Sequence, residues 1–122
     1  MEIHQVGSDY EKCVKEARKF AKEKNLWFVH PFENYSVMAG YATMAKEMLE
    51  QQKEINFDYV VVPTGGGGLV SSIGSFIKQT NPETKVISVE TDIATPFSSS
   101  LINKKNMIAE KASKFCNGSS VK

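Results

Sequence analysis

Apolar residues at helical spacing mark the first element of the chain. Charged Lys and Glu side chains lie between them, so the pattern predicts an amphipathic helix over about residues 9–24, with its apolar face formed by Tyr10, Val14, Ala17, Phe20 and Ala21. Ser8 and Glu11 stand three residues apart at its start, which is the spacing of a capping box. We therefore expect Ser8 to cap this helix.

Short apolar runs between turn residues predict strands, and these alternate with further helical patterns. The expected strands lie at 3–6, 26–29 (a short buried strand), 58–62 and 85–90, and the expected helices at about 36–53 and 68–79. Gly40, inside the second helix, suggests close approach by another backbone. Pro96 can begin one more helix, and the pattern fades from Asn103. Strands alternating with helices predict an α/β fold with a largely parallel sheet.

Composition narrows the functional classes without naming one. Fifteen basic and fourteen acidic residues give a formal charge of +1, which argues against nucleic acid as a partner. The apolar runs are too short for a membrane span, and the N-terminus lacks the features of a secretory signal. Cys13 and Cys116 lie far apart with no metal-ligand spacing, so we expect a cytoplasmic protein.

The four glycines Gly65 to Gly68 carry the clearest chemical signal. They follow the apolar run at 58–62 and precede the predicted helix at 68–79. The first N–H groups of a helix have no internal partner and lie at the positive end of its dipole, so they bind anions. Glycine allows both a sharp turn and close approach by a ligand. We interpret the run as a phosphate-binding loop; the alternative is a flexible tight turn.

The residues around the glycines narrow the kind of phosphate. Leu69 follows the last glycine where a nucleoside triphosphatase loop has lysine, which argues against that class. The dinucleotide fingerprint comes closer, because Gly66, Gly68 and Ser71 fit its spacing and Glu90 lies about 20 residues further on. An NAD-type dinucleotide-binding domain therefore remains an alternative, as does a non-catalytic remnant that binds an anion or a partner subunit.

Four segments occur in an order that resembles one family. They are His30-Pro31-Phe32, Gly40-Tyr41-Ala42-Thr43, the tetraglycine between Val62-Pro63-Thr64 and Leu69, and Val86-Ile87-Ser88-Val89-Glu90. Together they are similar to pyridoxal-phosphate enzymes of the tryptophan-synthase-β type, in the branch of threonine/serine dehydratases and serine racemases. The resemblance extends over nearly the whole chain from Gly7. Tyr41 and Ala42 depart from the usual Gly-Gln-Gly-Thr stretch of the family.

The resemblance implies both a fold and a cofactor site. The fold would be a three-layer αβα arrangement with a largely parallel sheet, in which residues 1–35 end the smaller domain and 36–122 form part of the larger one. The cofactor would be pyridoxal 5'-phosphate, with its phosphate held by Gly65, Gly66, Gly67, Gly68 and Leu69. Such enzymes act on serine or threonine as ammonia-lyases or racemases and are usually homo-oligomers.

The resemblance also implies a metal site and shows what the sequence lacks. Glu90 and the carbonyl of Ala94 match positions that hold Mg²⁺ or Ca²⁺ in related racemases, but Pro96 stands where those racemases offer an acidic group. The family lysine that binds the cofactor covalently lies in a Ser-x-Lys-x-Arg-Gly segment, and no such segment occurs here. We therefore expect this chain by itself to supply the phosphate loop without turning over substrate, and no catalytic residue is assigned.

Overall fold

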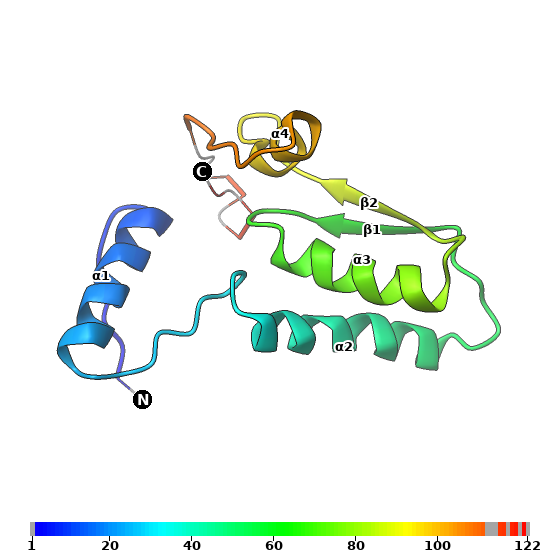
Figure 1. Cartoon of the computed structure of the whole chain (residues 1–122), viewed down its shortest axis with the longest axis horizontal. Coiled ribbons are helices and arrows are strands. Elements are labelled where there is room, and N and C mark those ends of the chain that lie inside the picture. The colour runs from blue at the N-terminus through cyan, green and yellow to red at the C-terminus, as the bar shows by residue number, and fades with distance from the viewer. Residues whose placement is uncertain (1, 112–114, 117, 120, 122) are drawn as a thin grey trace. The chain divides into compact units, whose positions relative to one another are not determined.

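The chain forms two compact units in a computed structural model, one spanning residues 1–30 and the other 31–122. The structure describes residues 2–111, 115–116, 118–119 and 121. Figure 1 shows the order of the elements, from α1 in the first unit to α4 in the second. The division falls five residues before the domain boundary expected at 35, and whether it separates two domains of the family fold stays a prediction.

The described residues of the first unit form one helix, α1, which spans Tyr10–Glu23. Its N-cap is Asp9 and not Ser8, so the predicted cap was off by one residue. The backbone N–H of Lys12 donates to Asp9 Oδ1 at 3.0 Å, and this bond lowers the pKa of Asp9 below its ordinary value. A carboxylate is favoured there because its negative charge meets the positive end of the helix dipole.

The strands expected at 3–6 and 26–29 are not formed within the described chain. Trp27 is 84% exposed and Leu26 57% exposed, so the predicted burial of that segment was also wrong. Phe28 does make contacts, with its ring 5.3 Å from the Arg18 guanidinium and 5.9 Å from the His30 ring. An apolar run becomes a strand only when another strand pairs with it, and this unit offers none in its described residues.

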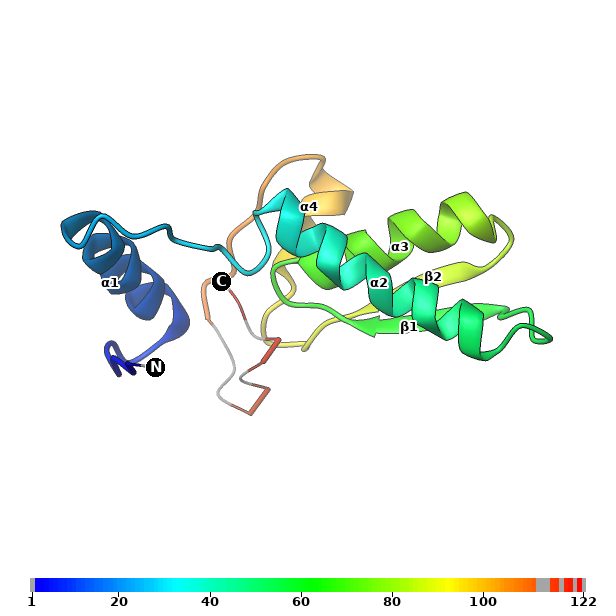
Figure 2. The same cartoon turned by 90° about the horizontal axis from the view of Figure 1, so that it is seen from below.

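The second unit is built on a parallel pair of strands. β1 spans Tyr59–Pro63 and β2 spans Lys85–Val89, and the register pairs Tyr59 with Lys85 and Pro63 with Val89. Helix α3, Gly68–Thr80, connects them, so the expected strand–helix–strand unit is present. Figure 1 shows the strands, α3 and α2 of this unit in successive layers, and in the view of Figure 2, turned by 90°, α2 passes in front of the strands. The predicted α/β class is confirmed by this architecture.

Helix α2 packs along α3, and the segment just before α2 lies against the glycine turn. The helix spans Tyr35–Gln51, and its N-cap is Asn34, whose Oδ1 accepts from the N–H groups of Ser36 and Val37. The Tyr41 hydroxyl donates to the carbonyl of Pro31 at 2.9 Å, which ties α2 to the turn before it. A Cβ placed on Gly40 would meet nothing within 4 Å, so the close approach expected there was wrong.

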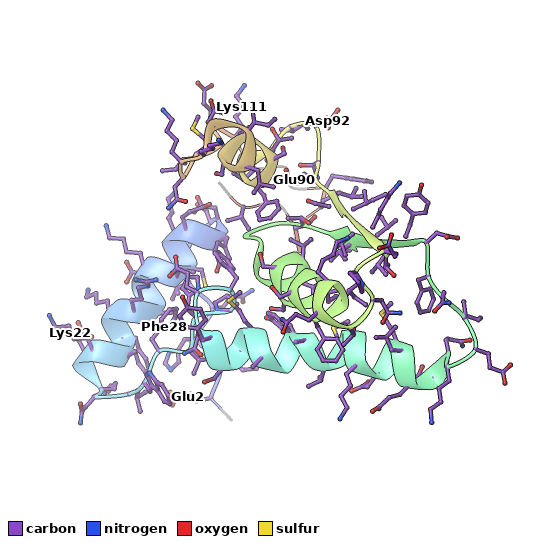
Figure 3. The ribbon with its side chains drawn as sticks, turned by 45° about the vertical axis from the view of Figure 1, so that its right-hand side comes forward. Glu2, Lys22, Phe28, Glu90, Asp92 and Lys111 are labelled. Atoms are coloured by element: carbon purple, nitrogen blue, oxygen red, sulfur yellow. The ribbon has the colours of Figure 1, made fainter. Side chains whose placement is uncertain are left out.

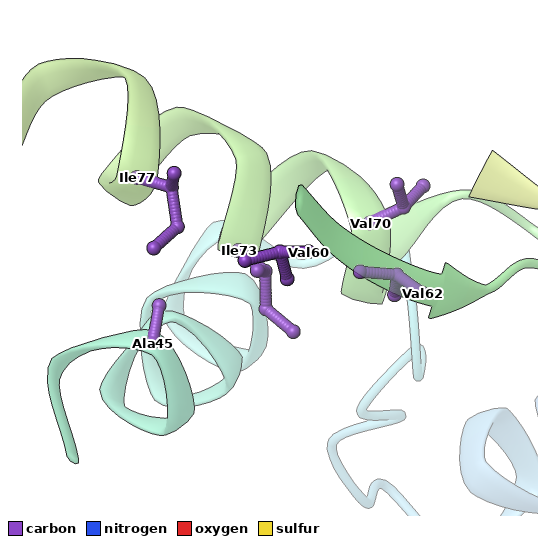
Figure 4. Packing of buried hydrophobic residues seen from close by; sticks show 6 residues of the cluster. All are labelled: Ala45, Val60, Val62, Val70, Ile73 and Ile77. Carbon is purple, nitrogen blue, oxygen red and sulfur yellow. The ribbon is translucent and has the colours of Figure 1, made fainter. Parts of the chain in front are cut away.

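The hydrophobic core lies between α2, α3 and one face of the sheet. Figure 4 shows its members, which are Ala45, Val60, Val62, Val70, Ile73 and Ile77. Alternate residues of the strands point the other way and are exposed, namely Tyr59, Val61, Ile87 and Val89. The pleat therefore decides which β-branched side chains stabilise this unit. Every helix in the described part is too short or too polar to serve as a membrane span.

Truncating Ile77 to alanine should destabilise the second unit strongly. Ile77 is fully buried at 0% exposure, so Ile77→Ala leaves a cavity and should lower the free energy of unfolding by about 2–5 kcal/mol. Ile87→Ala removes the same atoms from a side chain that is 41% exposed and should cost less than about 1 kcal/mol. Urea unfolding of both variants measures the difference, and equal losses would contradict this placement of the core.

Candidate functional site

The glycine turn begins where the last sheet bond is made. The N–H of Thr64 donates to the carbonyl of Val89 at 2.8 Å, directly after the paired part of β1. The first bond of α3 is made by the N–H of Ser71, which donates to the carbonyl of Gly67 at 2.9 Å. Between these two bonds the backbone leaves the sheet and enters the helix through Gly67, the N-cap, at φ +85°.

The amides between those two bonds have no acceptor in the described part of the chain. This holds for every N–H from Gly65 to Val70. A row of unpaired N–H groups at the start of a helix that is 13 residues long carries partial positive charge. The arrangement can therefore bind an anion with several oxygen acceptors, such as a phosphate.

Close packing requires each glycine of the turn to lack a Cβ. A Cβ on Gly66 would lie 2.5 Å from the Phe32 ring, and one on Gly68 would lie 2.6 Å from Phe32 Cβ. A Cβ on Gly67 would lie 2.7 Å from the Phe97 ring, and one on Gly65 would lie 2.8 Å from the Ser119 carbonyl oxygen. Packing by itself thus explains why all four residues are glycines. Only the unpaired amides indicate that the turn binds a phosphate.

Side chains beside the turn hold the sheet and the helix together. The buried Thr64 hydroxyl donates to the carbonyl of Val62 at 3.1 Å and accepts from Ser88 Oγ at 2.9 Å. Ser72 Oγ donates to the carbonyl of Gly68 at 2.7 Å. These hydroxyls link β1 to β2 and close the first turn of α3. Their hydrogen bonds therefore stabilise the fold around the turn.

The two expected metal ligands are engaged in other bonds. Glu90 follows directly after β2 (Figure 3). Its two carboxylate oxygens accept from the backbone N–H groups of Phe97 and Ser98 at 2.9 and 2.7 Å. The carbonyl of Ala94 accepts from Thr91 Oγ1 at 3.4 Å. The residues that the structure describes contain no group of three or more His, Cys, Asp or Glu placed to hold a metal ion. The expected Mg²⁺ or Ca²⁺ site finds no support.

Sequence reasoning missed the two aromatic rings that shape the turn. Phe32 precedes α2, and Phe97 lies in the first turn of α4, the helix at Pro96–Asn103. Their contacts with the glycines depend on how distant segments meet, which no spacing in the sequence reveals. One local signal for Glu90 was present. An acid shortly before a proline that can begin a helix is well placed to accept from that helix's first N–H groups.

Comparison with known proteins assigns this chain to one family. The chain matches the model of the family described as "Pyridoxal-phosphate dependent enzyme" over residues 1–122, and it therefore belongs to that family. It is 37% identical over 124 residues to a biosynthetic L-threonine dehydratase of Staphylococcus aureus, a match that covers 99% of this chain and 29% of that protein. The family indicated by the sequence motifs is thus confirmed.

Two solved structures show the same fold over most of the chain. The processed form of threonine deaminase isoform 2 from Solanum lycopersicum is 28% identical, with a TM-score of 0.85, covering 95% of this chain and 33% of that one. Serine racemase from Dictyostelium discoideum is also 28% identical, with a TM-score of 0.74, covering 93% of this chain and 36% of that one. The chain spans about a third of the length of these proteins or less.

Replacing Gly67 by alanine should destabilise the turn, whereas the same change at Gly40 should not. Gly67→Ala puts a Cβ at positive φ and against the Phe97 ring, so it should lower the free energy of unfolding by about 1–3 kcal/mol. Gly40→Ala lies in α2 in open space and should raise it by up to about 1 kcal/mol. Thermal unfolding of both variants gives the sign of each change. A stabilising Gly67→Ala would contradict the described turn.

Proposed function

We propose that this chain holds the phosphate group of pyridoxal 5'-phosphate in an enzyme that acts on amino acids. The phosphate oxygens would accept from the backbone N–H groups of Gly65, Gly66, Gly67, Gly68 and Leu69. One observation carries the proposal, namely the row of amides without an internal acceptor at the start of α3, in a chain that belongs to the pyridoxal-phosphate dependent family.

The donor set fits the phosphate group of a phosphate ester. Consecutive amides at the start of a helix can share several oxygens of one group, and the helix dipole favours its double negative charge. Gly66 is exposed although the Phe32 ring covers the side on which its Cβ would lie, whereas Gly67 and Gly68 are buried against Phe97 and Phe32. A ligand would therefore approach from the side of Gly66, with Phe32 and Phe97 keeping the backbone of the turn in shape.

The residues of this chain bind and orient, and the cofactor supplies the chemistry. When bound, pyridoxal phosphate acts as an electron sink for the electrons released at Cα of an amino acid. The reaction would be loss of ammonia from serine or threonine, or racemisation of serine. The similarity to a threonine dehydratase and the structural likeness to a threonine deaminase and a serine racemase support these substrates. A homo-oligomer in the cytoplasm remains our expectation for the complete enzyme.

Neither a divalent cation nor a dinucleotide is part of the proposal. Each would need the Glu90 carboxylate, as a metal ligand or as an acceptor for a ribose hydroxyl. Both oxygens of that carboxylate already accept backbone N–H groups of α4. The binding experiment below must therefore compare pyridoxine 5'-phosphate with NAD and with inorganic phosphate.

Binding should depend on the phosphate ester, so a ligand with only the pyridine ring should bind weakly. Pyridoxine 5'-phosphate and pyridoxine have no aldehyde, so neither can react with surface lysines, and they differ only in the phosphate. We expect pyridoxine to bind at least about tenfold more weakly, because hydrogen bonds to a charged group contribute about 1.5–3 kcal/mol each. Titration calorimetry measures both affinities, with NAD and inorganic phosphate as the competing ligands.

A carboxylate introduced into the turn should abolish that preference. Gly66→Asp brings negative charge to the proposed phosphate position, Gly66→Asn brings nearly the same bulk against the Phe32 ring without the charge, and Gly40→Asp adds the charge in α2, away from the turn. We expect Gly66→Asp to lose measurable binding of pyridoxine 5'-phosphate, Gly66→Asn to bind more tightly than Gly66→Asp, and Gly40→Asp to retain the affinity of the unaltered chain. Equal affinity of both compounds for the unaltered chain, or tighter binding of NAD, would refute the proposed function.

The 122-residue chain by itself should release no ammonia from serine or threonine when pyridoxal phosphate is added. Its sequence contains no Ser-x-Lys-x-Arg-Gly segment to hold the cofactor covalently. A coupled assay for ammonia tests this, with heat-treated protein as the control. Turnover above that control would show that another lysine of this chain performs the role.

A further inference from the structure

We propose that Glu90 is a positioning residue for the phosphate loop and acts through Phe97. Its carboxylate fixes the first turn of α4. The Phe97 ring in that turn holds Gly67, the N-cap of α3, in its left-handed conformation. This inference rests on the proposed function for its ligand, but the packing that it describes can be tested without one.

Glu90 completes the N-terminus of α4 in a way that no nearer residue does. Thr95 is the N-cap and makes no side-chain capping bond, and Pro96, the first helical residue, has no N–H. The first helical bond is made by Ser99 N–H, which donates to the carbonyl of Thr95 at 3.1 Å. The N–H groups left over are those of Phe97 and Ser98. Glu90 accepts from both, with one carboxylate oxygen each.

The Phe97 ring transmits this anchoring to the glycine turn. Two ring atoms, Cε2 and Cδ2, would lie 2.7 and 2.8 Å from a Cβ on Gly67, so the ring occupies the space that any side chain there would need. Phe97 also packs against the core cluster. In the described chain no other helix or strand packs its backbone against α4, so Phe97 and Glu90 connect its first turn to the rest of the unit.

The position of Gly67 matters because its amide belongs to the unpaired row. Gly67 is the N-cap of α3 and has φ +85°, and this conformation directs the neighbouring amides. Loss of the ring contact would let the turn sample other conformations, since glycine is the residue least restricted in φ and ψ. The carboxylate that resembles a metal ligand thus stabilises the loop through hydrogen bonds within the chain.

Substitution of Glu90, with Asp92 as the matched control, tests this role. Asp92 is an exposed carboxylate two residues further on and has no recorded hydrogen bond or ion pair among the described residues (Figure 3). Glu90→Ala should move the Gly67 Hα resonances towards those of Phe97→Leu, a variant that removes the ring current and keeps the cap. Glu90→Gln, which keeps one acceptor oxygen in place, should give an intermediate shift, and Asp92→Asn none.

The same variants should differ in ligand affinity. Glu90→Ala should weaken binding of pyridoxine 5'-phosphate measurably, by up to about thirtyfold if the whole stability contribution of a helix cap is lost from binding, whereas Asp92→Asn should bind as the unaltered chain does. Combining Glu90→Ala with Phe97→Leu should add little to either single change, because both act on one contact. Full additivity would mean that Glu90 does not act through Phe97.

Two results would overturn the proposal. One is a Glu90→Gln or Glu90→Ala chain whose Gly67 resonances and affinity match those of the unaltered protein. The other is a shift of the Phe97 and Ser98 amides with a higher unfolding temperature on addition of Mg²⁺ or Ca²⁺, which would make Glu90 a cation ligand. If the unaltered chain fails to bind pyridoxine 5'-phosphate, the proposed function fails, and the Gly67 resonances still decide the role of Glu90.

Discussion

The constraint that shapes the second unit is a gap in backbone hydrogen bonding at its glycine turn. The last bond of β1 is made at Thr64 and the first bond of α3 at Ser71, and the amides from Gly65 to Val70 between them have no acceptor in the described chain. Unpaired amides cost free energy unless water or a ligand satisfies them. The surrounding packing keeps the turn in this state, because two aromatic rings fill the space against its glycines.

Three segments that are distant in the sequence meet at this turn. The core formed by α2, α3 and the inner face of the sheet fixes the direction of α3. Phe32 reaches the turn from the segment before α2. The Tyr41 hydroxyl fixes this segment by donating to the carbonyl of Pro31. Phe97 reaches it from α4, which Glu90 anchors at its first turn. The shape of the loop is thus a property of the whole unit, although its amides belong to one short stretch.

Local patterns in the sequence were sufficient to predict the helices and the two strands that pair with each other. The helices expected at 36–53 and 68–79 correspond to Tyr35–Gln51 and Gly68–Thr80, and both predicted strands of the second unit formed. The segment at 26–29 failed because a strand needs a partner that an apolar run cannot guarantee. The role of Glu90 was missed for a related reason. Its fold-family position suggested a cation, whereas its bonds depend on which N–H groups Pro96 leaves unpaired.

The packing around the four glycines also constrains how this loop can change during evolution. A Cβ on Gly66 would meet the Phe32 ring, so a smaller residue at position 32 would make room there, whereas a Cβ on Gly68 would meet Cβ and the backbone of Phe32, which a smaller side chain does not remove. Gly67 is limited twice, by the Phe97 ring and by its positive φ, so no single compensating substitution would make room for a side chain there. Among related sequences, residues 32 and 66 should therefore vary together, while residues 67 and 68 should tolerate the least change.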